Sequence, residues 1–254
     1  MGDDPNVLVV TGGSRGIGAA TCRLAASKGY AVVVNYARNA DAADSLVGEI
    51  TAQGGRAVAV QGDVGIPEQI EPIFAAADRL GTLAGLVNNA GILGSAQRVE
   101  HYTPERIATM FAINVTGSIL CAKAAILRMS TRHGGRGGGI VNVGSSASKL
   151  GGAGASVDYA ASKGAIDTFT IGLAQEVAAE GIRVNAVRPG LIDTDIQRME
   201  GDPGRLQRLV PQVPMGRAGT AEEVASAILW FLSDEAAYCN GSILSVSGGR
   251  ALTP

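Results

Sequence analysis

The sequence lacks the features that mark several classes of protein. Lysine and arginine total 21 and aspartate and glutamate total 23, which gives a net charge of −2 at pH 7. A chain with neither sign in excess has no electrostatic footprint for nucleic acid. The apolar runs, such as Ala31–Val34, are short, and the acidic start Met1–Asp4 is unlike a signal peptide. We therefore expect a cytoplasmic protein with no nucleic-acid partner and no membrane partner.

Cysteine and histidine are scarce. The three cysteines, Cys22, Cys121 and Cys239, are widely separated, and there are only two histidines. No pair of cysteines has the spacing of a zinc site or a redox motif. We expect reduced thiols without a chemical role, and no metal site.

What the sequence does contain is an alternation of short β-branched runs with longer helical stretches. This alternation is typical of an α/β fold, in which helices cover both faces of a parallel sheet. The expected strands are Val7–Val10, Ala31–Asn35, Ala57–Gln61, Gly85–Asn88, Gly139–Val143, Arg183–Val187 and Ser242–Val246. We predict one domain over residues 1–254, built on a doubly wound sheet of seven strands, with ligands outside the carboxyl ends of the strands.

A glycine-rich turn, Thr11–Gly18, follows the first strand and begins a helix that runs to about Lys28. Glycines let backbone N–H groups approach a pyrophosphate at a helix N-terminus. The candidate contacts are Gly12, Ser14, Arg15, Gly16, Ile17 and Gly18. The spacing Gly-x3-Gly-x-Gly differs from the usual dinucleotide motif, so a plain connecting turn is the alternative.

The end of the second strand indicates which dinucleotide binds. An acidic residue there would bond the ribose hydroxyls of NAD(H), whereas a 2′-phosphate requires a cation. The acid is missing, and Asn35 is followed closely by Arg38, with Arg15 in the glycine turn. A guanidinium group matches phosphate geometry, so we expect NADP(H) to be preferred. The alternative is that both arginines are solvated charges and that NAD(H) also binds.

Two further polar turns follow strands. Asp63 and Val64 come after the third strand, where the carboxylate could accept from an adenine amino group. Asn88 leads into Asn89, Ala90 and Gly91 after the fourth strand, which could form a wall beside the cofactor. The alternatives are that Asp63 caps a helix beginning near Pro67, and that the asparagines only stabilise a turn.

The sharpest chemical signal is Tyr159 followed four residues later by Lys163. Residues four apart share one face of a helix. A phenol titrates near pH ~10, and a neighbouring ammonium and an oxidised nicotinamide would both lower that pKa, which would make Tyr159 a usable general acid/base. Taken alone, the same pattern is often a surface pair.

Together, the motifs Thr-Gly-x3-Gly-x-Gly, Asn-Asn-Ala-Gly and Tyr-x3-Lys resemble the classical short-chain dehydrogenases/reductases over nearly the whole chain. The similarity is closest to the branch of 3-oxoacyl-carrier-protein reductases and glucose dehydrogenases. The resemblance implies a Rossmann fold and hydride transfer between a nicotinamide and a ketone or secondary alcohol. It also implies that Tyr159 protonates the carbonyl oxygen, and that Lys163 bonds the nicotinamide ribose.

The resemblance implies two more catalytic residues. Ser145, after the fifth strand, would orient the carbonyl, and the adjacent Ser146 is the alternative because the family's serine-to-tyrosine interval is commonly one residue shorter. Asn114 would hold a water that relays protons from Lys163. Asparagine is a poor residue for the middle of a helix, which also favours a functional role for Asn114.

After the sixth strand, a Pro-Gly turn resembles the family's nicotinamide-binding segment. Its members are Pro189, Gly190, Ile192 and Thr194. A substrate lid is expected over residues 195–215, where Met199, Leu206 and Val210 could present an apolar surface, although such residues are more often the buried side of a helix. No cluster of cations in the sequence indicates a phosphorylated or carrier-bound substrate, so the substrate stays open.

By the same resemblance we expect a homotetramer, since the helix from Tyr159 to about Glu180 has more small and apolar residues than one core face needs. Two other functions are open. A lyase or epimerase of the extended relatives would usually need a longer C-terminal domain. A non-catalytic sensor of nicotinamide nucleotides would usually lack one of the catalytic residues, and none is missing.

Overall fold

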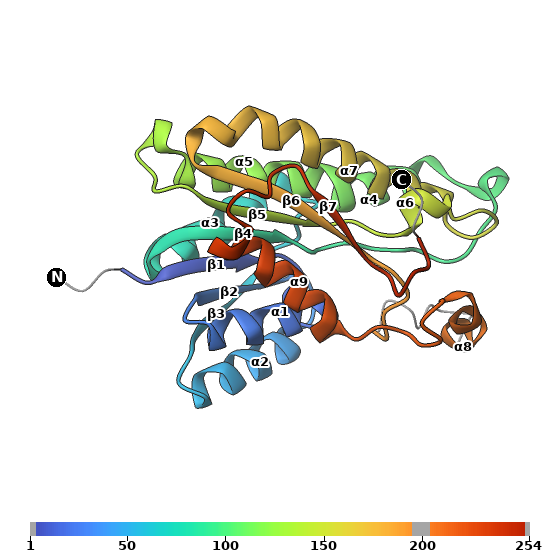
Figure 1. Cartoon of the computed structure of the whole chain (residues 1–254), viewed down its shortest axis with the longest axis horizontal. Helices are drawn as coiled ribbons and strands as arrows, with labels where there is room; N and C mark the ends of the chain where they lie inside the picture. The colour runs from blue at the N-terminus through green and yellow to red at the C-terminus, as the bar shows by residue number, and fades with distance from the viewer. Residues whose placement is uncertain (1–3, 195–203, 252–254) are drawn as a thin grey trace.

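The computed structural model describes residues 4–194 and 204–251, and they form a three-layer arrangement of helices around one parallel sheet (Figure 1). The strand order is β3-β2-β1-β4-β5-β6-β7 and all neighbours are parallel. The strands are β1 Asn6–Val10, β2 Ala31–Tyr36, β3 Arg56–Gln61, β4 Thr82–Asn88, β5 Gly138–Val143, β6 Ile182–Pro189 and β7 Ile243–Val246. All seven expected strands and the predicted fold class are confirmed.

The central strands are apolar along their whole length because helices cover both of their faces. Residues 7–10 of β1 and residues 31–34 of β2 are at most 1% exposed. Alternate residues point to opposite faces, so Val7 and Val9 belong to one core and Leu8 and Val10 to the other. The β-branched runs recognised in the sequence are thus the middle of two cores that share one sheet.

The helices divide into two layers. On one face lie α3 Ile70–Leu80, α4 Pro104–Phe111, α5 Ser118–Met129 and α7 Val157–Val177. On the other lie α1 Gly16–Ser27, α2 Ala40–Ala52 and α9 Ala221–Leu232. Two short helices, α6 Ala147–Leu150 and α8 Arg205–Leu209, lie beyond the carboxyl ends of the strands, where Figure 1 shows α8 beneath the C-terminal segment.

The order of the strands locates the ligand site. The chain leaves β1 toward β2 on one side, while β4 pairs with β1 on the other. In doubly wound sheets the crevice outside such a reversal is where ligands bind. The glycine turn after β1 and the Asn88–Gly91 turn after β4 both open into it.

Helices α4 and α5 are joined without a break by the π-helical turn η3 Ala112–Gly117. The resulting segment Pro104–Met129 has a mean hydropathy of 1.7 in its most apolar window, and by length and composition it could cross a membrane. The expectation that every apolar stretch is short was therefore wrong. In this fold the segment is a core helix, since α5 residues Cys121, Ala122 and Ala125 are at most 1% exposed within the core that β4 shares.

Candidate active site

A cavity of about 770 Å³ opens at the carboxyl ends of the strands. Many of the predicted site residues line it, although they come from five separate parts of the chain. They are Ile17, Asn89, Gly91, Ser145, Ser146, Tyr159, Lys163, Pro189, Gly190, Ile192 and Thr194. The fold therefore brings the motifs after β1, β4, β5 and β6 and the start of α7 to one place.

The glycine turn is held from behind by asparagine side chains. Asn35 Oδ1 accepts from the Gly12 N–H at 3.2 Å, and Asn35 Nδ2 donates to the carbonyls of Val60 and Gly62. Asn89 Nδ2 donates to the Thr11 and Gly12 carbonyls at 3.0 and 2.9 Å. The buried Asn35 amide is thus used by the protein, which assigns it to supporting the turn rather than to contacting a cofactor.

The turn itself fits a bound pyrophosphate. Gly12 and Gly16 have φ of 60° and 53°, a region that favours glycine, and a Cβ on Gly18 would lie 2.3 Å from the Gly12 carbonyl oxygen. No side chain caps α1, and its first turn has no acidic residue. The helix dipole and the N–H groups of this end therefore face the crevice without an anion from the protein, as a dinucleotide site requires.

Arg15, Arg38 and Asp63 lie outside the cavity that holds Tyr159. Arg15 and Arg38 are exposed at the carboxyl ends of β1 and β2, and neither forms an ion pair within residues 4–194 and 204–251. Asp63 Oδ1 accepts from the N–H of Gly65 at 2.9 Å, so its carboxylate closes a turn and does not cap the helix at Pro67. Val64 is buried.

Ser145 and Tyr159 both line the cavity, and Ser145 acts on the phenol by lowering its pKa. The Ser145 hydroxyl accepts from the Ala147 N–H at 3.1 Å. Ser146 is buried, and its backbone N–H donates to the carbonyl of Pro189. This geometry favours Ser145 over Ser146 as the partner of the tyrosine.

The pKa of Tyr159 differs from the expectation. Burial raises it above the ordinary value, while the hydrogen bond from Ser145 and the charge of Arg205 lower it in part. The ammonium of Lys163 lies 5.8 Å from the centre of the tyrosine ring, too far to reverse the effect of burial. In this state the phenol holds its proton at neutral pH.

Lys163 is 4% exposed, and its ammonium donates to the Val143 carbonyl at 2.8 Å. Burial lowers the pKa of Lys163 to about 8, with a smaller opposing effect from Asp167 one turn further along α7. The Asp167 carboxylate is in turn paired with Arg188 at 3.0 Å. The Asp167 carboxylate therefore keeps the ammonium of Lys163 charged up to a higher pH than burial alone would allow.

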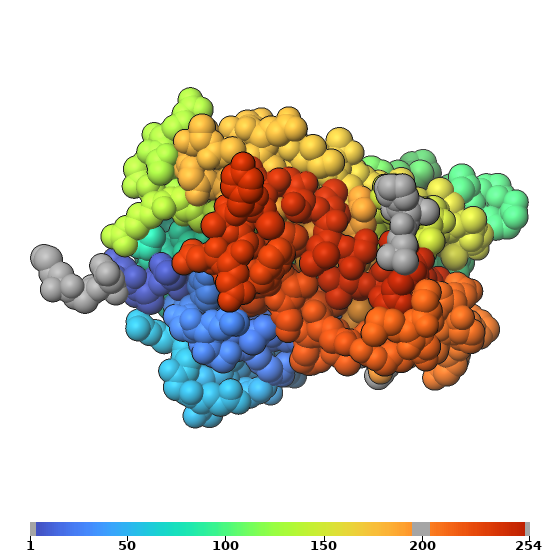
Figure 2. Space-filling model, viewed as in Figure 1, coloured from blue at the N-terminus to red at the C-terminus, as the bar shows by residue number. Residues whose placement is uncertain are grey.

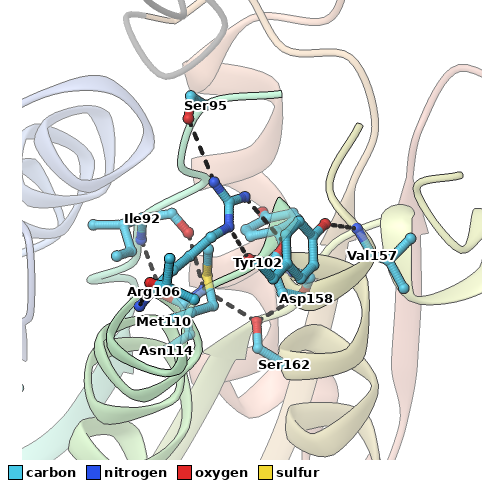
Figure 3. Close-up of polar contacts among 11 residues, drawn as sticks. Ile92, Ser95, Tyr102, Arg106, Met110, Asn114, Val157, Asp158 and Ser162 are labelled. Atoms are coloured by element: carbon cyan, nitrogen blue, oxygen red, sulfur yellow. Dashed lines mark hydrogen bonds and ion pairs between the residues drawn. The ribbon is translucent and has the colours of Figure 1, made fainter. Parts of the chain in front are cut away.

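Asn114 occupies the π-helical turn η3 and is fully buried. Its Oδ1 accepts from the Ile92 N–H at 2.8 Å, while its Nδ2 donates to the Ile92 carbonyl and to Ser162 Oγ (Figure 3). Single π turns inside α-helices often mark functional sites. The Cβ of an alanine at Gly91 would lie 3.3 Å from Asn114 Oδ1 and 3.5 Å from Lys163 Nζ, so the asparagine, the lysine and the Gly91 backbone border one space.

One polar cluster beside the site was not found from the sequence. Asp158 is buried just before Tyr159, and it accepts from the Tyr159 N–H and from Arg106 Nε at 2.7 Å (Figure 3). Arg106 stacks on Tyr102, whose hydroxyl accepts from the Val157 N–H. Burial alone would raise the pKa of Asp158, but the hydrogen bonds from Arg106 and the Tyr159 N–H hold it below its ordinary value. The cluster joins α4 to the beginning of α7.

The Pro-Gly turn after β6 reaches across to the glycine turn. Ile192 forms a bridge with Gly219, and the Thr194 methyl group lies 3.4 Å from where a Gly16 Cβ would stand. Gly190 is needed because a Cβ there would lie 2.6 Å from Ser247 Cα. Residues 190–194 and the start of α1 thus form opposite sides of one crevice.

The expected lid is described from residue 204 onward, and Met199 lies outside the described residues. Leu206 and Val210 do not line the cavity, but Leu209 does. The same wall carries Arg205 and Arg208, and Arg250 joins them from the chain end. Arg250 is more than 40 positions from Arg208 in the sequence, so only the fold brings these arginines to one wall.

Comparisons with known proteins agree over almost the entire chain. Residues 12–251 match a family model described as enoyl-(acyl carrier protein) reductase. The uncharacterized oxidoreductase YgfF of Escherichia coli (strain K12) is 52% identical over 245 residues, which cover 96% of this chain and 99% of that protein. A 3-oxoacyl-[acyl-carrier-protein] reductase of Synechocystis is 37% identical, with 97% of each chain covered.

Among solved structures, a short chain dehydrogenase of Burkholderia cenocepacia J2315 in complex with NADP is 34% identical. It matches with a TM-score of 0.88 and covers 96% of this chain and 97% of its own. The fold of this chain therefore has a counterpart in a solved protein.

Proposed function

The chain belongs to the short-chain dehydrogenase/reductase family, and we propose that it is an NADP(H)-dependent oxidoreductase that interconverts a ketone and a secondary alcohol. The observation that carries the proposal is the convergence of Ser145, Tyr159 and Lys163 on one cavity. A phenol beside a hydroxyl and an ammonium at the wall of a cavity is placed to exchange a proton with a substrate oxygen.

The residues divide the proton chemistry among them. When bound, the nicotinamide supplies or accepts the hydride at the carbonyl carbon. The Ser145 hydroxyl donates to the carbonyl oxygen and orients it toward Tyr159, which gives up its phenolic proton to that oxygen. Burial keeps the Tyr159 pKa above its ordinary value, so the proton is present at neutral pH when reduction begins.

Lys163 and Asn114 serve the tyrosine. The buried ammonium of Lys163 stabilises the phenolate that remains after proton transfer, because opposite charges attract strongly where solvent is excluded. Asn114 has both amide atoms bound to Ile92 and Ser162, which fixes its orientation beside Lys163. We propose that it holds the water through which Lys163 is reprotonated.

The cofactor assignment is supported by three observations. The uncapped start of α1 fits a pyrophosphate, and the exposed guanidinium groups of Arg15 and Arg38 suit a 2′-phosphate. The solved relative from Burkholderia cenocepacia contains NADP. Residues Ser14, Ile17, Asn89, Ala90, Gly91, Pro189, Gly190, Ile192 and Thr194 are proposed to complete the cofactor site. A cytoplasmic homotetramer remains our expectation.

The experiment compares wild type with Tyr159→Phe, using NADPH and NADH with a panel of ketones and keto esters. Removing the general acid should lower kcat by about 10²–10⁴-fold, while the dissociation constant for NADPH, measured by its fluorescence, stays within about twofold. NADPH should bind more tightly than NADH. If neither nucleotide binds, the proposal is wrong, whereas tight binding without turnover on any substrate would favour a nucleotide sensor.

A further inference from the structure

The first turn of α7, which carries Tyr159, is held by side chains other than that of its N-cap residue. The Ser156 side chain does not cap the helix. Instead the Tyr159 N–H donates to Asp158 Oδ1 at 2.9 Å. The Val157 N–H donates to the hydroxyl of Tyr102 at 3.0 Å. The first N–H groups of a helix have no partner within it, so these two acceptors set where the turn begins.

Both acceptors are tied to α4 through one guanidinium group. Arg106 Nε donates to Asp158 Oδ2 at 2.7 Å and Arg106 Nη2 donates to Oδ1 at 3.3 Å, so both carboxylate oxygens are bound (Figure 3). The central carbon of the same guanidinium lies 4.6 Å from the centre of the Tyr102 ring. We name Tyr102, Arg106 and Asp158 the arginine cluster. It attaches the turn that carries Tyr159 to α4.

The arginine cluster also contacts one wall of the cavity. Arg106 Nη1 donates to Ser95 Oγ at 3.4 Å (Figure 3). A Cβ on Gly94 would lie 3.2 Å from Arg106 Nη2, so the backbone at this point packs against the guanidinium. Leu93 and Ala96, on either side of this point in the chain, line the cavity. The guanidinium that supports α7 therefore also supports the apolar segment against which a substrate would lie.

The same segment also contacts the loop that precedes α7. The Gln97 N–H donates to the Ala155 carbonyl at 3.0 Å. Ala153 and Ala155 line the same cavity as Ser145 and Tyr159. Figure 2 shows the green segment before α4 and the yellow-green segment around α6 at the same end of the molecule. Residues 93–97 thus connect the arginine cluster to the loop between the serine and the tyrosine.

The two helices are joined a second time at Asn114. This residue follows Arg106 by eight positions on the helix that α4 and η3 form together. Asn114 Nδ2 donates to Ser162 Oγ at 3.1 Å, and the Ser162 hydroxyl donates to the Tyr159 carbonyl at 2.7 Å. The backbone of Tyr159 is therefore bound at its N–H by the arginine cluster and at its carbonyl beside Asn114, while its side chain lines the cavity.

We propose that Arg106 and Asp158 are positioning residues for the reduction: their ion pair fixes the backbone of Tyr159, so that the phenol meets the substrate oxygen at proton-transfer distance. The inference rests on the proposed carbonyl reduction and adds two residues that act through Tyr159. Neither is among the described residues that line the cavity, so neither is placed to touch the substrate. A reacting group displaced by about 1 Å can cost about 10²-fold in rate.

The first test compares wild type, Arg106→Met and Arg106→Lys in the reduction of a ketone by NADPH, at a temperature where circular dichroism shows each protein folded. Arg106→Met should lower kcat about 10- to 100-fold and change KM and the NADPH dissociation constant less, and Arg106→Lys should recover part of the loss. Arg23→Met, which breaks the exposed ion pair with Glu49, is the matched control and should keep the wild-type kcat. A wild-type kcat in folded Arg106→Met overturns the inference and leaves the proposed function intact.

The second test uses the solvent isotope effect to distinguish a displaced phenol from partial unfolding. With the proton donor displaced, proton transfer should limit the single-turnover rate more strongly, so the ratio of the rates in H₂O and D₂O should be larger in Arg106→Met than in wild type. Partial unfolding would lower the amount of active enzyme and leave this ratio unchanged, and that result overturns the inference. If Arg106→Met does not fold, Arg106→Lys takes its place, because it keeps a cation beside Asp158 without the paired geometry.

A measurement without turnover separates the two proposals. The chain has five tyrosines, and in protein labelled with 3-fluorotyrosine the NMR resonance of Tyr159 is identified by its absence in Tyr159→Phe. With and without NADPH, Arg106→Met should shift this resonance and Arg23→Met should not. If wild type turns over no carbonyl compound, the proposed function fails, and the resonance alone decides on the positioning role. An unshifted Tyr159 resonance in Arg106→Met overturns it.

Discussion

Lys163 shows how a residue with a proposed catalytic role can lower the stability of the fold. The residue is 4% exposed, and its ammonium donates to the Val143 carbonyl at 2.8 Å. Burial lowers its pKa from an ordinary 10.5 to about 8. At neutral pH the folded protein therefore holds a charge that costs less free energy in the unfolded chain, where water solvates it.

The sign of the pH dependence follows from these two values. Between about pH 8 and 10.5 the unfolded chain binds a proton at Lys163 that the folded chain has released, so the free energy of unfolding rises with pH in this window. Below this pH window, the full free-energy cost of burying the charged ammonium is present. Relative to Lys163→Met, wild type should gain about 1–3 kcal/mol between about pH 7.5 and about pH 10 in urea unfolding followed by circular dichroism.

Lys28→Met, which removes an exposed lysine after α1, is the control and should follow wild type. If Lys163→Met and wild type show the same pH dependence, the buried ammonium is not the cause. The variant should also be inactive, which would separate the catalytic role of Lys163 from its effect on stability.

At the scale of elements, the beginning of α7 matters most, because Tyr159 is in its first turn. No side chain of Ser156 caps this helix, and Asp158 instead accepts from the Tyr159 N–H. The carboxylate is also paired with Arg106 of α4, and their side chains are only 2% and 14% exposed. The ion pair holds the helix that carries Tyr159 against the helix that leads to Asn114.

Arg106→Met should destabilise the protein by about 3–5 kcal/mol, because it leaves the Asp158 carboxylate buried without its cation. Asp158→Asn in addition should restore part of the loss, and urea unfolding of both variants measures it. Arg23→Met breaks the ion pair with Glu49, which is 47% and 41% exposed, and should cost less than about 1 kcal/mol. Equal costs for Arg106→Met and Arg23→Met would contradict a structural role for the buried pair.

At the scale of the whole molecule, one helical layer has apolar side chains on its outer surface. Ile119 and Leu127 of α5 and Ile171 of α7 are 39%, 51% and 46% exposed. The two helices lie in the same layer in Figure 1. Apolar residues grouped on one side of a protein often mark an interface, which agrees with the expected homotetramer.

Ile171→Arg should therefore dissociate the assembly, because a charge would be buried in an apolar contact without a partner. Light scattering coupled to size exclusion should give four times the chain mass for wild type and a smaller value for the variant. Val99→Arg changes a residue that is 56% exposed outside these helices, and it should leave the mass unchanged. A monomeric wild type would refute the expected assembly.

Much of the fold and part of the site could be predicted from the sequence because they depend on local patterns. The β-branched runs alone predicted seven strands, since a strand buried on both faces must be apolar at successive positions. The motifs that follow β1, β4, β5 and β6 are likewise contiguous, and a parallel sheet necessarily brings its carboxyl ends together. That is why Tyr159, Lys163, Ser145 and the glycine turn could be named before their geometry was known.

Other properties depend on contacts between distant residues, and only the tertiary structure decided them. Burial rather than a neighbouring charge dominates the pKa of Tyr159, and of the two adjacent serines it is Ser145 that lowers this pKa. Asn35 faces the glycine turn, and Arg106 finds Asp158 52 positions away. Arg250 donates to Gln212 38 positions away, which joins the chain end to the turn after α8. Sequence periodicity reports which side of an element is buried, but the partner that a polar side chain meets there is set by the packing of the whole chain.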